Sequence, residues 1–249
     1  MSDVPYDLSI DGGGDQFPVA GPSPRLSWKP VANTTAYRVQ MSVGGDQSEV
    51  TVEGAGVHRF LEWPWRPLRS AERVAWRVAA APDGEWSPWH EFEAGLFDPD
   101  WTARWISPPE ASEQPAGTRP AHVLTTTFEL SGAAPTARLY ATALGLYEVF
   151  VNGVRAGTAE LTPGTSAYEH TVYAQAYDVT ANLTTGTNTL EIVLSDGWYH
   201  GRFGAFRRPV DWGPTVAARA ELHLRLDDGT RRVVATDGAW TARTSQIVR

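Results

Sequence analysis

The sequence predicts an all-β protein made of two antiparallel sandwich domains. Apolar residues recur mostly at every second position, in short runs separated by Gly, Pro, Asn and Asp, which is the pattern of half-buried strands. The 249 residues are enough for two domains of roughly 100 to 150 residues each. No long segment shows convincing helical spacing. We therefore expect sheets that pack face to face, rather than a helical or mixed fold.

The first domain is expected to span residues 1–98. Its segments 37–41 and 74–78 alternate between apolar and polar residues, as half-buried strands do. Together with a Trp-bearing segment at 26–28 and an aromatic segment at 84–92, their order resembles a fibronectin type III domain. The resemblance implies a β-sandwich.

A Trp-Ser-Pro-Trp motif that starts at Trp86 and ends at Trp89 lies in the aromatic segment. It is similar to the Trp-Ser box of some fibronectin-like domains, in which Trp rings stack with Arg side chains. Arg77 is the candidate cation for this stacking. We expect these rings to complete the core and a surface ladder, with sugar stacking as the alternative.

The sequence Asp-Pro-Asp at residues 98–100 interrupts the alternation and places the boundary of a second domain, residues 99–249. This domain opens with the segment 101–106, which contains two Trp residues. Residues 107–120 are rich in Pro, Ser, Glu and Gly and lack periodicity, which predicts an exposed loop.

Alternating segments are clearest in the second domain. One of them ends at Asn152 and Gly153, a pair that supplies the positive φ angles of a tight hairpin turn. The number and length of the strands suit an antiparallel jelly-roll β-sandwich. The predicted strands are residues 125–130, 137–141, 147–151, 190–194 and 220–226.

The composition excludes several classes of function. Hydrophobic residues make up 42% of the chain, and 11 Trp residues provide ample material for packed cores. The net charge of −8 would repel phosphate backbones and anionic membrane surfaces, so we expect neither a nucleic-acid nor a membrane partner. The lack of Cys excludes disulfides, thiol catalysis and thiolate metal sites. A bound metal would need oxygen or His ligands.

The beginning of the chain lacks the basic region and the apolar run of a secretory signal. Nowhere do 18 apolar residues follow one another, as a membrane-spanning helix would require. We expect a cytoplasmic protein by default. Export of a processed form is the alternative, since a leader could lie outside this sequence.

Four motifs follow one another between residues 139 and 204. They are ALGLYEVFVNG from residue 143, LTPGTSAY from residue 161, YDVT from residue 177 and SDGWYHGRFG from residue 195. Their order and spacing resemble the N-terminal region of bacterial α-L-rhamnosidases of the large multi-domain kind, glycoside hydrolases that act on terminal α-L-rhamnosides. The segment 101–106 and the fibronectin-like first domain also fit that family's domain order. One departure is Thr165, where the family usually carries Trp.

The resemblance implies that catalysis and sugar binding belong to different domains. In that family a downstream (α/α)6 barrel supplies the general acid and base for inverting hydrolysis, and this chain lacks it. We therefore assign no catalytic residue and expect the chain to be inactive alone. The family's jelly-roll module is similar to carbohydrate-binding modules, and in some members it binds L-rhamnose with a calcium ion. The chain ends before the family's jelly roll normally returns its last strands, so the second domain could be truncated.

The candidate binding residues lie mainly in the loop that begins at residue 196. It combines aromatic rings, which can stack on the C–H face of a sugar, with polar groups that can bind hydroxyls. Asp196 is the first choice for a hydroxyl or calcium contact, although one carboxylate alone cannot coordinate calcium. The loop could instead plug the end of the domain or dock on the barrel. The candidates in this loop are Asp196, Trp198, Tyr199, His200 and Arg202.

Two further candidates lie outside this loop. Tyr168 precedes an expected strand and could face the same end of the domain as Asp196. Asn152 is included as a sugar contact, but its expected main role is to form the hairpin turn. Asp178 is expected to organise a turn, or to cap a short helical turn, through its carboxylate.

Three hypotheses about function stay open at this point. The chain could bind sugar, in the form of L-rhamnose glycosides, and support the downstream barrel. It could be a purely structural module without sugar affinity. It could also be an independent protein-interaction module.

Overall fold

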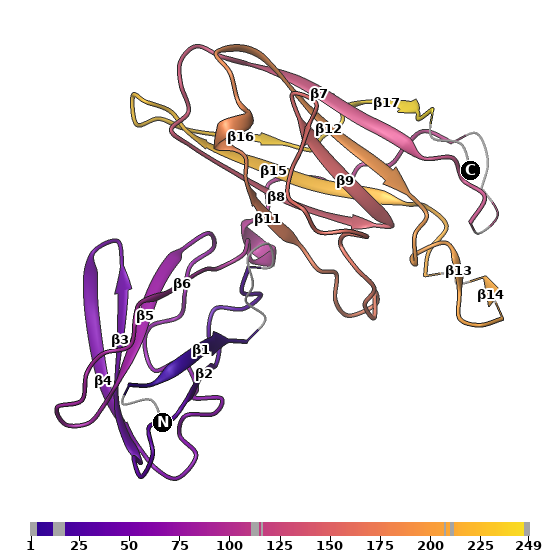
Figure 1. Ribbon diagram of the computed structural model, residues 1–249. Helices are drawn as coiled ribbons and strands as arrows, with labels where there is room; N and C mark the ends of the chain where they lie inside the picture. Colours follow the sequence, from indigo (N-terminus) through magenta and orange to yellow (C-terminus); the bar gives the residue numbers. More distant parts are fainter. Residues whose placement is uncertain are drawn as a thin grey trace. The chain divides into compact units, whose positions relative to one another are not determined.

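The computed structural model describes residues 4–11, 18–110, 115, 117–206, 208–209 and 212–246. Within these ranges the regular structure is β-strand apart from two single 3-10 turns, η1 (Asp98–Asp100) and η2 (Thr180–Asn182). Figure 1 shows two compact units, Met1–Asp100 and Trp101–Arg249. The predicted all-β fold class is confirmed. No helix in the described part of the chain is long and apolar enough to cross a membrane.

The first unit contains a pair of strands and a four-stranded antiparallel sheet in the order β4-β3-β5-β6. Its core is aromatic: the ring of Trp28 lies edge-on to Tyr37 at 5.2 Å and to Trp76 at 6.4 Å. The strands are β1 (Tyr6–Ile10), β2 (Leu26–Lys29), β3 (Ala36–Val43), β4 (Asp46–Glu53), β5 (Arg73–Ala80) and β6 (His90–Glu93).

The second unit contains two antiparallel sheets whose inner faces contribute to one mostly aliphatic core. One sheet has the strand order β10-β9-β12-β7-β17, and the other has the order β11-β8-β15-β16. The strands are β7 (His122–Leu130), β8 (Thr136–Leu144), β9 (Leu146–Val151), β10 (Val154–Arg155), β11 (Gln175–Asp178), β12 (Gly186–Ser195), β15 (Ala217–Arg225), β16 (Arg231–Ala235) and β17 (Thr241–Thr244), with a hairpin of β13 (Arg202–Phe203) and β14 (Arg208–Pro209).

The hairpin predicted at Asn152 and Gly153 is present, with φ angles of 52° and 77°. Asp178 organises the turn that follows β11, because its carboxylate accepts the backbone N–H of Thr180 at 3.0 Å. Both predictions are confirmed.

Residues 101–106, which we call the strap, lie along β15 beyond the end of β16. Ile106 and Ala218 exchange two backbone hydrogen bonds of 2.9 Å. The carboxylate of Glu221, which points away from the core, accepts the backbone N–H groups of Thr102 and Ala103. Although Glu221 is on the outer face of its sheet, it is fully buried.

One end of the second unit, which we call the loop end, gathers its long connections. Strand pairing places the end of β12, the end of β8 and the beginnings of β7, β9 and β15 together there. The connections that meet at this end are those before β7, between β10 and β11, and between β12 and β15. Their described residues are 107–110, 115, 117–121, 156–174, 196–206, 208–209 and 212–216. Figure 1 shows the β13–β14 hairpin at this end of the sandwich.

Candidate functional site

The predicted loop leaves β12 through a tight turn that requires two glycines. At Gly197, with φ +54°, an added Cβ would lie 2.4 Å from the side chain of Leu146. At Gly201 it would lie 1.9 Å from the carbonyl oxygen of Gly197. Only glycine fits at these two contacts, which explains the spacing of the Asp-Gly-Trp-Tyr-His-Gly motif.

Three aromatic rings form what we call the aromatic platform at the loop end. The ring of Tyr168 lies 5.2 Å from that of Tyr199 and 5.8 Å from that of Trp212. Tyr199 is buried, Tyr168 is half-buried, and Trp212 is 41% exposed. The hydroxyl of Tyr168 donates to the Gly164 carbonyl at 3.2 Å, and burial raises the pKa of this tyrosine.

Tyr168 therefore lies at the same end as the Asp196 loop, as the sequence suggested. Trp212 was not among the predicted residues. It lies well after the motif, in a Pro- and Gly-rich stretch without periodicity, and nothing in its spacing indicated contact with Tyr168. Its neighbour Gly213 approaches Tyr199 so closely that an added Cβ would lie 2.1 Å from the tyrosine hydroxyl.

The other aromatic and basic residues of the motif differ in accessibility. His200 is buried, and its Nδ1 lies 2.9 Å from the Gly213 carbonyl oxygen. Its own carbonyl accepts the backbone N–H of Gly117 at 3.0 Å. Trp198 is half-buried and Arg202 is exposed. His200 thus braces the loop, whereas the side chains of Trp198 and Arg202 are accessible to solvent.

Asp196 belongs to a buried ion cluster that we call the Arg119 clamp. The guanidinium of Arg119 binds the carboxylate of Asp196 and, through Nε and Nη2, that of Glu110 at 2.5 and 3.0 Å. Nη2 also donates to the Pro214 carbonyl at 3.0 Å. Burial alone would lower the pKa of Arg119, but its two carboxylate partners raise it above the ordinary value. The guanidinium is therefore held as a buried cation.

The clamp does not favour the calcium role predicted for Asp196. Both carboxylate oxygens already accept hydrogen bonds, one from the Arg119 guanidinium and one from its backbone N–H. A calcium ion would have to displace that cation, and it prefers six to eight oxygen ligands. Among the described residues, no three His, Asp or Glu side chains are grouped so that they could hold a metal.

Asn152 lies at the other end of the sandwich from Asp196. Strands β9 and β12 run antiparallel over six paired residues, which separates these two side chains by on the order of 20 Å. The amide of Asn152 donates to Asn182 and Asn188, and its oxygen accepts the N–H of Thr189, all at 2.8 Å. These contacts give Asn152 a structural role and leave it outside the aromatic platform.

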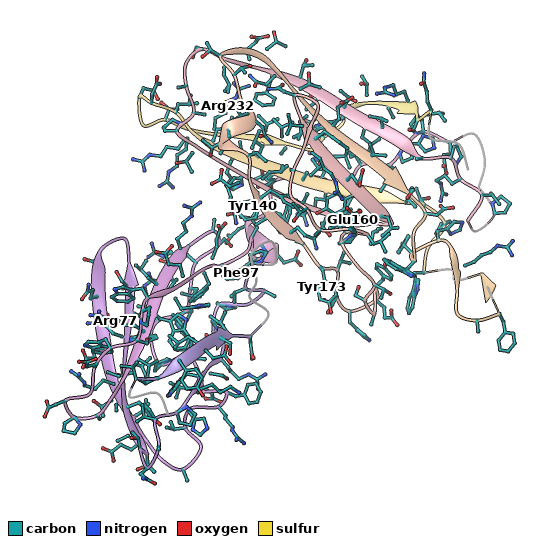
Figure 2. The ribbon with its side chains drawn as sticks, in the orientation of Figure 1. Arg77, Phe97, Tyr140, Glu160, Tyr173 and Arg232 are labelled. Atoms are coloured by element: carbon teal, nitrogen blue, oxygen red, sulfur yellow. The ribbon has the colours of Figure 1, made fainter. Side chains whose placement is uncertain are left out.

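The tryptophan motif of the first unit forms the predicted ladder. The guanidinium of Arg77 lies 4.7 Å from the ring of Trp86 and 4.3 Å from that of Trp89, and Arg38 also lies 4.7 Å from Trp86. Figure 2 labels Arg77 on the four-stranded sheet. The stacking with Arg77 is confirmed. Because two guanidinium groups already stack on Trp86, the geometry favours the structural interpretation over sugar stacking.

Two families match separate parts of the chain. Residues 5–98 match the Rha78A-like, N-terminal immunoglobulin domain. Residues 132–249 match the alpha-L-rhamnosidase N-terminal domain. Each match falls within one of the two compact units of the structure.

Similar proteins agree with these matches. An α-L-rhamnosidase of Alteromonas sp. (strain LOR) is 31% identical over 251 residues, which cover 91% of this chain and 27% of that protein. One from Formosa agariphila is 31% identical over 203 residues, covering 76% of this chain and 22% of that protein. The chain therefore spans about a quarter of the length of these relatives.

Solved structures show the same architecture. An α-L-rhamnosidase from Aspergillus terreus superposes with a TM-score of 0.78 at 28% identity, covering 95% of this chain and 29% of that one. The Streptomyces avermitilis α-L-rhamnosidase complexed with L-rhamnose superposes with a TM-score of 0.74 at 20% identity, covering 96% and 41%. At this lower identity the second likeness supports the fold alone.

Proposed function

We propose that this chain, the N-terminal immunoglobulin-like and rhamnosidase N-terminal domains of an α-L-rhamnosidase, binds carbohydrate at the aromatic platform of its second unit. The family resemblance predicted from residues 139–204 is confirmed by the two family matches. The chain is the non-catalytic N-terminal region of such an enzyme. The observation that supports binding is the partly exposed ring of Trp212 beside Tyr168.

The chemistry of the platform suits a sugar. An exposed indole offers its face to the C–H groups of a pyranose ring, and nearby polar groups can orient the hydroxyls. Arg202 and the hydroxyl of Tyr168 are candidates for the second task. The ligand that fits this proposal is a terminal L-rhamnose residue, since the relatives that are 31% identical to this chain are α-L-rhamnosidases. Because Asp196 is held by Arg119, we propose binding without calcium at that carboxylate.

A second function, support of the catalytic region, is favoured by an apolar surface next to the platform. Leu161 is 56% exposed and Tyr173 is 49% exposed, and both lie on the connection between β10 and β11. Figure 2 labels Tyr173 at this end of the sandwich. Gly164 lies between the two, since its N–H donates to the Leu161 carbonyl and a Cβ added at Gly164 would lie 3.9 Å from the ring of Tyr173. Exposed apolar side chains that adjoin one another are a feature of docking surfaces. We propose that the (α/α)6 barrel of the longer protein covers them.

Titration calorimetry with L-rhamnose tests the binding proposal. We expect heat with the unaltered chain both in calcium and in EDTA, loss of that heat in Trp212→Ala, and unchanged heat in Trp105→Ala. Trp105 is a matched control, because it is 40% exposed but lies in the strap. No heat at millimolar sugar in either buffer would reject sugar binding and leave the supporting role.

A separate assay checks the non-catalytic assignment. Incubation of the pure chain with an aryl α-L-rhamnoside should release no phenol, because a jelly roll's surface loops seldom hold two rigid carboxylates at the spacing needed for inversion. Turnover that persists through repurification would contradict the assignment.

A further inference from the structure

Arg119 connects segments that are far apart in the sequence. Its own backbone precedes β7, Glu110 lies in the connection before it, Asp196 follows β12, and Pro214 precedes β15. The side chain of Arg119 is completely buried. Of these contacts, those to Asp196 and Pro214 mark the two ends of the loop that carries Tyr199 and Trp212.

The chemistry of the guanidinium suits this task. A planar guanidinium can bind two carboxylates and a carbonyl at once, whereas a lysine ammonium is a single point charge. Nε and Nη2 engage Glu110, Nη1 engages Asp196, and Nη2 also reaches Pro214. Glu110 therefore fixes the plane of the group, and the other two contacts draw both ends of the loop to it.

The hydrogen bonds inside the loop do not replace this connection. The N–H of Trp212 donates to the Tyr199 carbonyl at 3.3 Å, and the N–H of His200 donates to the Asp196 carbonyl at 3.3 Å. These bonds join parts of the loop to one another. The guanidinium instead joins both loop ends to the segment before β7.

We propose that Arg119 is a positioning residue for the aromatic platform. By holding Asp196 and Pro214 on one guanidinium, it closes the loop between them and fixes Tyr199 and Trp212 against Tyr168. The effect on a ligand rests on the proposed function, but the closure of the loop does not.

Hydrogen exchange of the full chain, with and without Arg119→Lys, tests the proposal. We expect the N–H groups of His200 and Trp212 to exchange roughly tenfold faster in the variant, while those of β15 change by less than about twofold, because the loop opens without global unfolding. Arg243→Lys is the matched control, since the Arg243 side chain is 62% exposed. Its exchange pattern should equal that of the unaltered chain.

Glu110→Gln provides a second variant that keeps the arginine. It removes one carboxylate from the clamp, and we expect it to speed the same loop amides by a smaller factor than Arg119→Lys. If the β15 amides also exchange faster in Arg119→Lys, that variant is globally destabilised, and Glu110→Gln then becomes the test of the proposal. Unchanged exchange at His200 and Trp212 in Glu110→Gln would then overturn the proposal, as would unchanged exchange in a folded Arg119→Lys.

Calorimetry with L-rhamnose separates this proposal from the function it refines. Weaker sugar binding in Arg119→Lys, together with faster loop exchange, is the expected result. Loop opening in Arg119→Lys with no heat from the unaltered chain rejects sugar binding and supports the positioning role. If the unaltered chain gives heat with L-rhamnose but the loop amides of Arg119→Lys exchange at an unchanged rate, only the positioning role is rejected.

Discussion

The two units differ in what they bury. Among the described residues, Ser87 is the one buried polar side chain of the first unit, whereas the second unit buries ten, including Arg119 and Glu221. The first unit instead fills its core with rings, among them Trp28 and Trp76. Its ladder cations lie outside the core, stacked on Trp86 and Trp89.

This difference shows how the second unit holds its irregular segments. A short connection between paired strands is fixed by the sheet itself. A long connection has no partner strand, and its backbone N–H and C=O groups must find other acceptors and donors. In the second unit, buried charges provide them: Glu221 for the strap and Arg119 for the aromatic loop.

The largest loss of stability is expected from a substitution in the aromatic core of the first unit. Trp76 is completely buried, so Trp76→Ala should lower the free energy of unfolding of that unit by about 4 kcal/mol through lost packing and a cavity. Hydrogen exchange of the β3 and β5 amides in increasing urea measures it. The amides of β15 should keep their stability, and an equal loss there would contradict the independence of the two cores.

A slightly smaller effect is expected from the buried charge of the second unit. Glu221→Ala leaves the N–H groups of Thr102 and Ala103 without their acceptor and should cost about 3 kcal/mol, measured on the β15 amides. Glu160→Ala is the control, because that side chain is 72% exposed and its loss should change stability by a few tenths of a kcal/mol at most. A cost below about 1 kcal/mol for Glu221→Ala would show that the strap contributes little.

The surface ladder of the first unit should matter less than either core. Arg77 stacks on Trp86 and Trp89 and donates to Gln40 at 2.7 Å, so Arg77→Ala should cost about 1 kcal/mol. Arg73→Ala tests the same change on an Arg with a 62% exposed side chain, and near-zero cost is expected. Chemical denaturation followed at the β5 amides compares the two variants. Equal losses of unfolding free energy would show that the ladder does not stabilise the first unit.

The smallest effect concerns pH. Burial lowers the pKa of His122. The charge of Arg119 lowers this pKa further, whereas the carboxylates of Glu110 and Asp196 raise it without cancelling the shift. The unfolded chain therefore takes up this proton first, and the second unit should lose stability as the pH falls from about 6.5 towards the lower folded pKa. Urea unfolding monitored at the β12 amides between pH 7 and pH 5 measures the slope.

His122→Gln should flatten that slope in the second unit and leave the first unit unchanged. The first unit keeps a slope of its own, because burial also lowers the pKa of His90. An unchanged slope at β12 in the variant would assign the pH dependence to another group.

The strands could be predicted from the sequence because their pattern is local. Tyr37, Val39 and Met41 alternate with polar residues and are buried as expected. Five segments predicted in the second unit overlap β7, β8, β9, β12 and β15. Strands β11, β16 and β17 were not predicted, since they are short strands at the edges of their sheets. Three successive residues of β11 are buried, so it shows no alternation at all.

The site was harder to predict because its contacts join distant segments. Asp196 was chosen for its carboxylate, but the partner that engages it, Arg119, lies in a Pro-rich stretch without periodicity. Trp212 reaches Tyr168 only through the folded loop. Asn152 was correctly expected to form a turn, but strand direction, which a single motif does not encode, places it far from Asp196.

The strap also determines which piece of this protein could be moved into another one. The sheets of the second unit begin at β7, but Glu221 and Thr236 bind backbone groups of residues 102–104. A transplanted domain that started at β7 would lose these contacts and leave the Glu221 carboxylate without its two backbone donors. The portable module therefore begins at Trp101, where the second compact unit starts, and a foreign domain joined ahead of that tryptophan leaves the strap contacts in place.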